Sequence, residues 1–197
     1  VPVTGQEQRV QQRYRISVKL GFSLAACTAL AVSAATSQDP AAWDAKSGTW
    51  RVTGNAGTGS RRGDDWGEWV SRAWYGDFDF SGSITIPADA NRGCQTAILL
   101  RYAGRSECYK LVLDGANRRV RLVENHYGKS IELDSVNTDL LVRGTPVRFR
   151  ATGRGPRLSV VLGSDRVTLS HSNVRIPGGR VGLAVRGGTL HFSELTA

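Results

Sequence analysis

Hydrophobic and polar residues alternate one by one along much of the chain beyond position 48. Between residues 77 and 86, aspartate and serine separate Phe78 from Phe80 and from the glycine and isoleucines that follow on the same face. Residues 146–152 repeat the pattern, with arginines between Val147 and its apolar partners. Because strand side chains point alternately to two faces, this period of two predicts strands with one apolar and one polar face.

Turn-forming Gly, Asn, Asp and Pro residues interrupt these runs at short, fairly even intervals. No segment of residues 36–197 keeps a 3.6-residue period over three turns. The pattern therefore predicts an all-β fold, a two-sheet antiparallel β-sandwich, with residues 97–100, apolar on both faces, as a central strand. The expected strands are 49–53, 68–74, 77–86, 96–102, 107–114, 119–124, 130–134, 146–152, 157–162, 165–170, 179–186 and 189–195.

The N-terminal segment has the layout of a secretory signal peptide. Basic residues between positions 13 and 19 precede the apolar run 20–32, and Ser33, Ala34 and Ala35 follow. This order predicts cleavage after Ala34 or Ala35 and a secreted or periplasmic protein. The run is shorter than the roughly 20 apolar residues that a membrane-spanning helix needs, so no stable span is expected.

Two other interpretations of this segment stay open. It could be a buried helix of the domain, or Leu24–Cys27 could be a lipoprotein box with an anchored cysteine. If translation starts at Val18, residues 1–17 are not native. The expected organisation is an N-terminal extension with signal peptide over 1–35, a lead-in over 36–48 and one β-sandwich domain over 49–197.

Charge narrows the classes of partner. The chain has a formal net charge of +9, and removing residues 1–35 takes away four basic residues and one acidic residue, which leaves +6. Arginines are scattered among acids along the strands rather than gathered in a dense block, so nucleic acid is not an expected partner. A modest positive charge favours acidic partners, such as an anionic polysaccharide or oligosaccharide.

Two cysteines, Cys94 and Cys108, follow the signal segment, and export would permit a disulfide between them. A hairpin turning at Gly104–Arg105 would place Cys108 opposite Tyr102, eight residues from Cys94. At about 3.3 Å per residue that separation exceeds bonding reach unless the chain bends back before residue 96. The pairing therefore stays open.

The motifs of common catalytic and metal sites are missing. The three histidines lack the spacing of a zinc site, and the chain contains no G-x-S-x-G, P-loop or dinucleotide fingerprint. No catalytic residue and no cofactor are therefore predicted. The segment 63–68, GDDWGE, carries three carboxylates, so Asp64 and Asp65 are candidates for a structural Ca²⁺ site, with solvated loop acids as the alternative.

Three of the five tryptophans fall within residues 66–74. If this stretch is a strand, Trp66, Val70 and Trp74 share one face and Trp69 lies on the other. Trp66, after a polar loop, is the best candidate for stacking on a sugar, and Trp69 is a second candidate. Trp74, which leads into the strand at 77–86, is expected to pack.

Further candidate ligand contacts come from two hairpins. If the first is regular, Arg101 and Tyr109 lie opposite each other and project from one face, as a sugar contact or as a packed pair at a sheet rim. At the second, Glu124, His126 and Tyr127 form a polar group beside a turn in which Gly128 takes the left-handed conformation.

The order of motifs resembles a known superfamily. YGDFDFSGSITIP at 75–87, TAILLRYAGRSECYKLVLD at 96–114, RRVRLVENHYGKSIEL at 118–133 and IPGGRVGLAVRGGTLHFSEL at 176–195 are similar in spacing and turn type to concanavalin A-like lectins and glucanases, in the laminin G-like jelly-roll branch. The resemblance covers residues 49–197. The closing strand of such domains often carries an Asp after the Phe, whereas Phe192 is followed here by Ser193. The glucanase motif E-x-D-x-x-E is absent, and residues 109–114 lack the acid and the amide of a related branch that acts on keto-disaccharides, which weakens both enzymatic interpretations.

Three functions remain. The first is a secreted, lectin-like carbohydrate-binding domain without a recognisable catalytic motif. The second is a carbohydrate-active hydrolase or lyase of the same fold with an atypical site. The third is a cell-surface module that binds protein.

Overall fold

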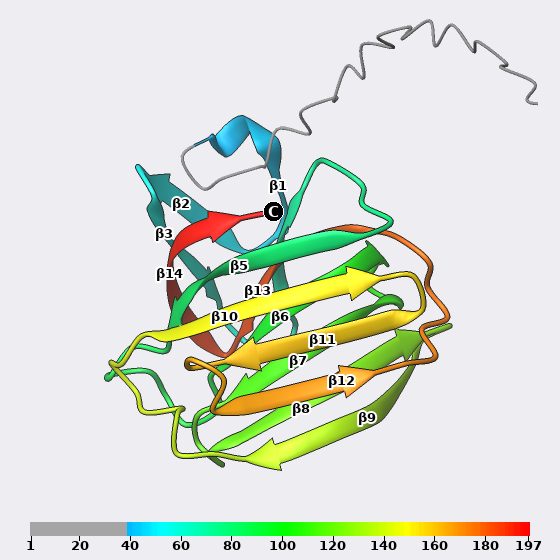
Figure 1. Cartoon of the computed structure of the whole chain (residues 1–197). Coiled ribbons are helices and arrows are strands. Elements are labelled where there is room, and N and C mark those ends of the chain that lie inside the picture. Colours follow the sequence, from blue (N-terminus) through cyan, green and yellow to red (C-terminus); the bar gives the residue numbers. More distant parts are fainter. Residues whose placement is uncertain (1–38) are drawn as a thin grey trace, which may run out of the picture. The chain divides into compact units, whose positions relative to one another are not determined.

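The computed structural model describes residues 39–197, which form fourteen strands, one short 3-10 turn at Pro40–Ala42 and no α-helix. Two antiparallel sheets of seven strands each pack face to face (Figure 1), so the predicted two-sheet β-sandwich is confirmed. The expectations for residues 1–35 fall outside the described residues. Within residues 39–197 no helix has the length and apolarity to cross a membrane.

Each sheet is named here after one of its strands. The β7 sheet has the order β1 (Trp43–Ser47), β4 (Gly67–Ser71), β13 (Arg180–Arg186), β6 (Gln95–Gly104), β7 (Glu107–Asp114), β8 (Arg119–His126) and β9 (Lys129–Asn137). The β10 sheet has the order β12 (Val167–His171), β11 (Arg157–Leu162), β10 (Val147–Arg154), β5 (Phe78–Thr85), β14 (Gly188–Thr196), β3 (Ala56–Arg61) and β2 (Thr49–Thr53).

Strands β1 and β3 were not among the strands expected from the sequence. β1 lies in the expected lead-in and pairs with β4, which carries the sandwich upstream of Thr49. β3 has the sequence AGTGSR, whose glycines have low strand propensity. Rings occupy the space at these glycines, since a Cβ at Gly57 would lie 2.3 Å from the Phe192 ring and one at Gly59 would lie 2.2 Å from Trp50. The glycines therefore leave room for these rings, and pairing with β2 and β14 holds β3 in the sheet.

Aromatic rings fill one end of the space between the sheets. The Trp69 ring stacks on Trp43 at 4.5 Å and on Trp50 at 5.7 Å between centroids, and Phe192 lies 5.0 Å away. Trp69 is 4% exposed. Offset stacking of large buried rings stabilises a core beyond their burial alone. Trp69 is therefore a core residue and is not available for stacking on a ligand.

The outer face of the β7 sheet carries a second apolar layer, separate from the core between the sheets. Val70, Ala97 and Leu99 are buried there, and Trp66 packs against the same cluster. This layer explains why residues 97–100 are apolar on both faces, and β6 is central, as expected, between β13 and β7. Trp66 and Val70 share this face and Trp69 lies on the opposite one, which confirms the predicted alternation.

Two expectations from the sequence are wrong. The β6–β7 hairpin pairs Leu100, not Arg101, with Tyr109, because an irregularity between Leu100 and Gly104 shifts the register. Trp74 is 60% exposed rather than packed, because β4 ends at Ser71 and the chain leaves the sheet before position 74.

The question of a disulfide is answered by the two apolar layers. Cys94 lies in the core between the sheets and Cys108 in the layer on the outer face of the β7 sheet. Both are buried free thiols. Burial raises the pKa of the Cys108 thiol to about 12, so it remains protonated at neutral pH.

Candidate functional site

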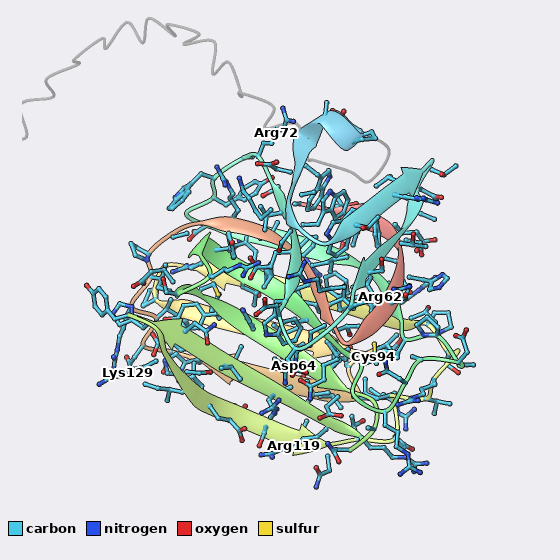
Figure 2. All side chains as sticks on the ribbon, turned by 180° about the vertical axis from the view of Figure 1, so that it is seen from behind. Arg62, Asp64, Arg72, Cys94, Arg119 and Lys129 are labelled. Carbon is cyan, nitrogen blue, oxygen red and sulfur yellow. The ribbon has the colours of Figure 1, made fainter. Side chains whose placement is uncertain are left out.

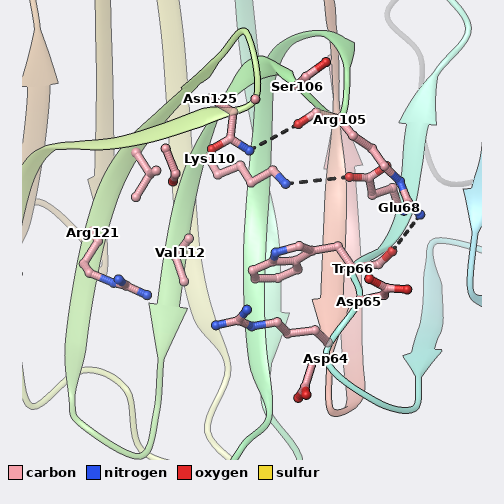
Figure 3. A pocket seen from close by; sticks show the side chains of 14 residues that line it. Asp64, Asp65, Trp66, Glu68, Arg105, Ser106, Lys110, Val112, Arg121 and Asn125 are labelled. Carbon is pink, nitrogen blue, oxygen red and sulfur yellow. Dashed lines mark hydrogen bonds and ion pairs between the residues drawn. The ribbon is translucent and has the colours of Figure 1, made fainter.

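A pocket of about 500 Å³ opens on the outer face of the β7 sheet (Figure 3), a volume within the usual range for a small-molecule site. Its floor comes from β4, β7 and β8, and its rim from the β3–β4 loop and the β6–β7 and β8–β9 turns. The pocket is lined by Asp64, Asp65, Trp66, Glu68, Arg105, Ser106, Lys110, Val112, Arg121, Val123, Asn125, Gly128, Ser130 and Arg186.

The half-buried Trp66 ring forms the apolar wall of the pocket. Two cations lie over it: Lys110 Nζ is 5.2 Å and Arg186 Cζ is 5.0 Å from its centroid. Both distances fall within the roughly 6 Å limit for cation–π attraction. Arg186 is itself held by Gln95, whose side-chain oxygen accepts from its Nε at 3.1 Å and from its Nη2 at 2.7 Å. The ring is therefore fixed by groups from two other strands of the sheet.

A buried ion network lies beneath one side of the pocket. Glu68 is 0% exposed, and its Oε2 accepts from Tyr102 Oη at 2.8 Å and from Arg105 Nε at 3.2 Å. Its Oε1 lies 3.7 Å from Lys110 Nζ but accepts no hydrogen bond. Burial and the hydrogen bond to Glu68 raise the pKa of Tyr102 well above its usual value. The network keeps Lys110 in place over the Trp66 ring.

Arg105 ties the β6–β7 turn to the β3–β4 loop. Its Nη2 donates to Ser47 Oγ at 2.8 Å and to the Trp66 carbonyl at 3.1 Å. Asn125 Nδ2 in turn donates to the Arg105 carbonyl at 3.2 Å. These bonds hold two rim loops in a fixed relation to the sheet.

Arg121 stands on β8 across the pocket from Trp66 (Figure 3). Its nearest acid is Glu132, at the 4.0 Å limit of an ion pair, and Arg119 holds the same carboxylate more tightly at 2.6 Å. Apart from this long ion pair, the Arg121 guanidinium makes no hydrogen bond within residues 39–197, so its five N–H donors are available to a ligand in the pocket. Four basic side chains line the pocket against three acids; Glu68 pairs with two of the four, Arg105 and Lys110, and Asp65 pairs with Arg61 outside the pocket lining.

Three residues considered as sugar contacts lie inside the sandwich rather than at this pocket. Tyr109 is 0% and Glu124 2% exposed, and Tyr109 Oη donates to Glu124 Oε1 at 2.8 Å. Arg101 is 1% exposed and donates to the backbone carbonyls of Ile176 at 2.9 Å and Gly155 at 2.6 Å. Burial raises the pKa of Tyr109 to about 12. These side chains anchor loops to the core.

The β8–β9 turn is as the sequence predicts, since Tyr127 and Gly128 both have positive φ, of 50° and 73°. His126 Nδ1 lies 2.8 Å from Glu107 Oε2, and the His126 ring packs against Tyr127 at 4.2 Å. Tyr127 is 82% exposed. The turn contributes Gly128 to the rim of the pocket, whereas His126 and Tyr127 are not among the lining residues.

The sequence patterns do not predict most of the residues that line the pocket. Glu68, Lys110, Arg121 and Arg186 belong to four different strands. The available signal was polar residues within otherwise apolar strands, since Lys110 interrupts the run 108–113. Such a residue marks a functional position as readily as a solvated face, and only the sheet order brings the four together.

No protein-family model and no curated protein matches the chain, but solved structures match its fold. The carbohydrate-binding module CBM66 from Bacillus subtilis is 22% identical, with a TM-score of 0.68, and the match covers 78% of this chain and 93% of that one. The exoplasmic/lumenal domain of VIP36, in a Ca²⁺/Man3GlcNAc-bound form, is 12% identical, with a TM-score of 0.64 over 83% and 89%. Arcelin-5, a lectin-like defense protein from Phaseolus vulgaris, is 12% identical, with a TM-score of 0.57 over 79% and 91%. The fold is therefore the concanavalin A-like jelly roll.

Some of these similar structures hold metal ions, namely the Ca²⁺ forms of VIP36 and a potassium-bound form of Emp46p. In this chain Asp64 and Asp65 are exposed, and Asp65 pairs with Arg61 at 3.4 Å. Within residues 39–197 no three His, Cys, Asp or Glu side chains come close enough to hold a metal ion. A Ca²⁺ ion takes six to eight oxygen ligands, so the two aspartates do not by themselves fit it.

Proposed function

We propose that this protein is an exported carbohydrate-binding module whose sugar site is the pocket against Trp66. The observation that carries the proposal is the convergence of one aromatic wall with several positioned donors in one pocket. Sugars combine apolar C–H surfaces with many hydroxyls, and sites of this kind pair an apolar wall with a few placed polar groups. The jelly-roll fold shared with a carbohydrate-binding module and with lectin-like domains supports the same function.

The ligand is inferred to be an acidic saccharide. Arg121 makes only a 4.0 Å ion pair with Glu132 and no hydrogen bond, Arg186 lies against Trp66, and Asn125 lines the pocket from β8, the strand that carries Arg121. Arginine binds planar carboxylates and tetrahedral oxyanions through paired hydrogen bonds. A uronate carboxylate or a sugar sulfate placed between Trp66 and Arg121 would supply the missing negative charge.

Export is part of the proposal. The basic, apolar and small-residue order within positions 13–35 supports a signal peptide, and a secreted or periplasmic location would bring the module to extracellular polysaccharides. The N-terminal sequence of the mature protein tests this directly. A mature chain that still contains residues 20–32 would contradict it.

The binding function is tested with a glycan array followed by isothermal titration calorimetry on the best ligand. Trp66→Ala and Arg121→Gln should each weaken binding by about tenfold or more, because each removes a principal wall or donor. Trp74→Ala is the matched control, since Trp74 is 60% exposed and outside the pocket. Equal effects of Trp66→Ala and Trp74→Ala would refute the assigned site.

A hydrolase remains a second candidate because Glu68, a fully buried carboxylate with one oxygen free of hydrogen bonds, lines the pocket. Glycoside hydrolysis uses two carboxyl groups about 5 to 9.5 Å apart. Release of reducing ends from the polysaccharide that binds, lost in Glu68→Gln, would favour the enzyme. No binding to any glycan on the array would favour a module that binds protein.

A further inference from the structure

Two further hollows adjoin the pocket against Trp66. The second, of about 620 Å³, shares Asp64 with the first and includes Arg62, Gly93 and Gly187. The third, of about 840 Å³, shares Gly93 with the second. It lies between the β5–β6 loop, the β7–β8 turn and the β9–β10 loop, and it is lined by Arg92, Gly93, Gly115, Ala116, Asn117, Arg118, Leu141, Val142 and Arg143. Each hollow shares one lining residue with the next, Asp64 and then Gly93, so the three adjoin along the surface.

The row of three hollows is rich in arginine, and its outer part lacks compensating acids. The second hollow adds Arg62, and the third adds Arg92, Arg118 and Arg143 without a single acidic lining residue. Arg143 is held by the backbone carbonyls of Ala90 and Asn91. Arg62, Arg92 and Arg118 are exposed, and none has a hydrogen-bonded or ion-paired side chain within residues 39–197.

Strand β8 runs along the line from the first hollow to the third. Arg121 lies in the first pocket and Arg118 in the third, three residues back along the chain. At about 3.4 Å per residue their backbones are roughly 10 Å apart. In Figure 2, Arg62 lies on the opposite side of the view from Lys129, with Asp64 between them. A ligand that fills the first pocket must therefore extend beyond it to reach these arginines.

We infer that the three hollows form one binding path for a polymeric acidic saccharide, with Trp66 at one end and Arg92 and Arg118 at the other. The inference rests on the proposed sugar site and adds the length and the repeated charge of its ligand. Acidic units beyond the first meet the free guanidiniums of Arg62, Arg92 and Arg118, so affinity rises with chain length. Exposed ion pairs are individually weak, and several in a row are needed to hold a chain.

The probes are galacturonic acid oligomers of one, two, four and six units, with polygalacturonate, a sulfated polysaccharide, a neutral polysaccharide and duplex DNA for comparison. Titration at 20 and 150 mM salt should show affinity rising with oligomer length and falling with salt, because exposed charges are screened. The sulfated arm distinguishes sulfate from carboxylate recognition. The neutral chain should bind at least tenfold more weakly than the acidic one.

The variant Arg92→Gln/Arg118→Gln removes the far end of the path without touching Trp66. It should weaken hexamer binding by roughly threefold to tenfold and leave binding of the single unit unchanged. Arg148→Gln/Arg157→Gln is the control, since both residues are exposed, lie on β10 and β11 of the other sheet, and change the net charge equally. Thermal unfolding verifies that both double variants fold.

Different failures lead to different conclusions. The extended path is refuted, and the proposed sugar site stands, if the single unit binds at Trp66 but affinity does not depend on oligomer length. The same conclusion follows if the two double variants lose the same amount of affinity for the hexamer. If Trp66→Ala affects neither the single unit nor the hexamer, the proposed site itself is refuted. Tighter binding of duplex DNA than of polygalacturonate at 150 mM salt would overturn the saccharide as the ligand.

Discussion

The buried pair Glu68 and Lys110 allows a sharp test of the geometry beneath the pocket. Their side chains are 0% and 6% exposed, with Oε1 and Nζ 3.7 Å apart. Glu68→Gln keeps the size of the side chain and removes its charge, which leaves the Lys110 ammonium buried without a carboxylate. Removing one partner of a buried ion pair costs about 3–5 kcal/mol of unfolding free energy.

The loss should fall near the lower end of that range. Arg105, the second cation on Glu68, is 51% exposed and returns to water at little cost. The cation–π contact of Lys110 with Trp66 persists and is worth about 0.5–1 kcal/mol. We therefore expect Glu68→Gln to lower the free energy of unfolding by about 3 kcal/mol. Lys110→Met should cost about 1–2 kcal/mol, because Glu68 keeps Arg105 and Tyr102 as partners.

Urea unfolding followed by tryptophan fluorescence measures both variants and the double variant. The double variant should be less destabilised than the sum of the single ones by about 2 kcal/mol, since neither charge is then left alone. The slope of free energy on urea concentration should not change, which verifies that the same surface is exposed on unfolding. Additivity within about 0.5 kcal/mol would mean that the two charges do not interact and would refute the reasoning.

Three further outcomes are expected. Burial raises the pKa values of Tyr109 and of the Cys108 thiol to about 12. In the unfolded chain the two groups have pKa values of about 10 and 9, so their contribution to the free energy of unfolding is complete below those values and is lost as the pH rises towards 12. Urea midpoints should therefore fall between pH 9 and 11; a constant midpoint would contradict this. Cys94 and Cys108, both buried, should react with a thiol reagent only after unfolding, and a native disulfide by mass spectrometry would refute the free thiols. Gly182→Ala would place a Cβ 2.2 Å from the Trp69 carbonyl oxygen and should cost about 2 kcal/mol by thermal or urea unfolding, whereas wild-type stability would show that the strands separate freely.

The alternation of apolar and polar residues predicts most of the strands, but it does not locate all of them. The alternation around Phe78 and Phe80 places both in the core, as observed. The glycine-rich β3 gave no such signal, because its role is to leave room for rings from neighbouring strands. Arg101 has a φ of 46° at the irregularity in β6, and this local change of register cannot be read from alternation. Because of this shift of one position, Tyr109 lies opposite Leu100 instead of Arg101.

The candidate site was predictable only in part, for the same kind of reason. Alternation separates Trp66 from Trp69, but it does not say which face looks into the sandwich. Strand β6 is apolar on both of its faces, so the sequence is compatible with either Trp66 or Trp69 facing the core between the sheets. Antiparallel pairing decides it, because the sheet order brings Lys110 on β7 and Arg186 on β13 to the Trp66 ring.

The sequence by itself therefore determined the all-β class, the central strand, the opposite orientations of Trp66 and Trp69, and the turn at Gly128. These features depend on neighbours within a few residues, where backbone geometry leaves few choices. Only the tertiary structure decided that Trp69 is core, that Trp74 is exposed, and that basic residues from separate strands meet beside Trp66. Those features depend on strand order and register, which distant segments settle together through packing.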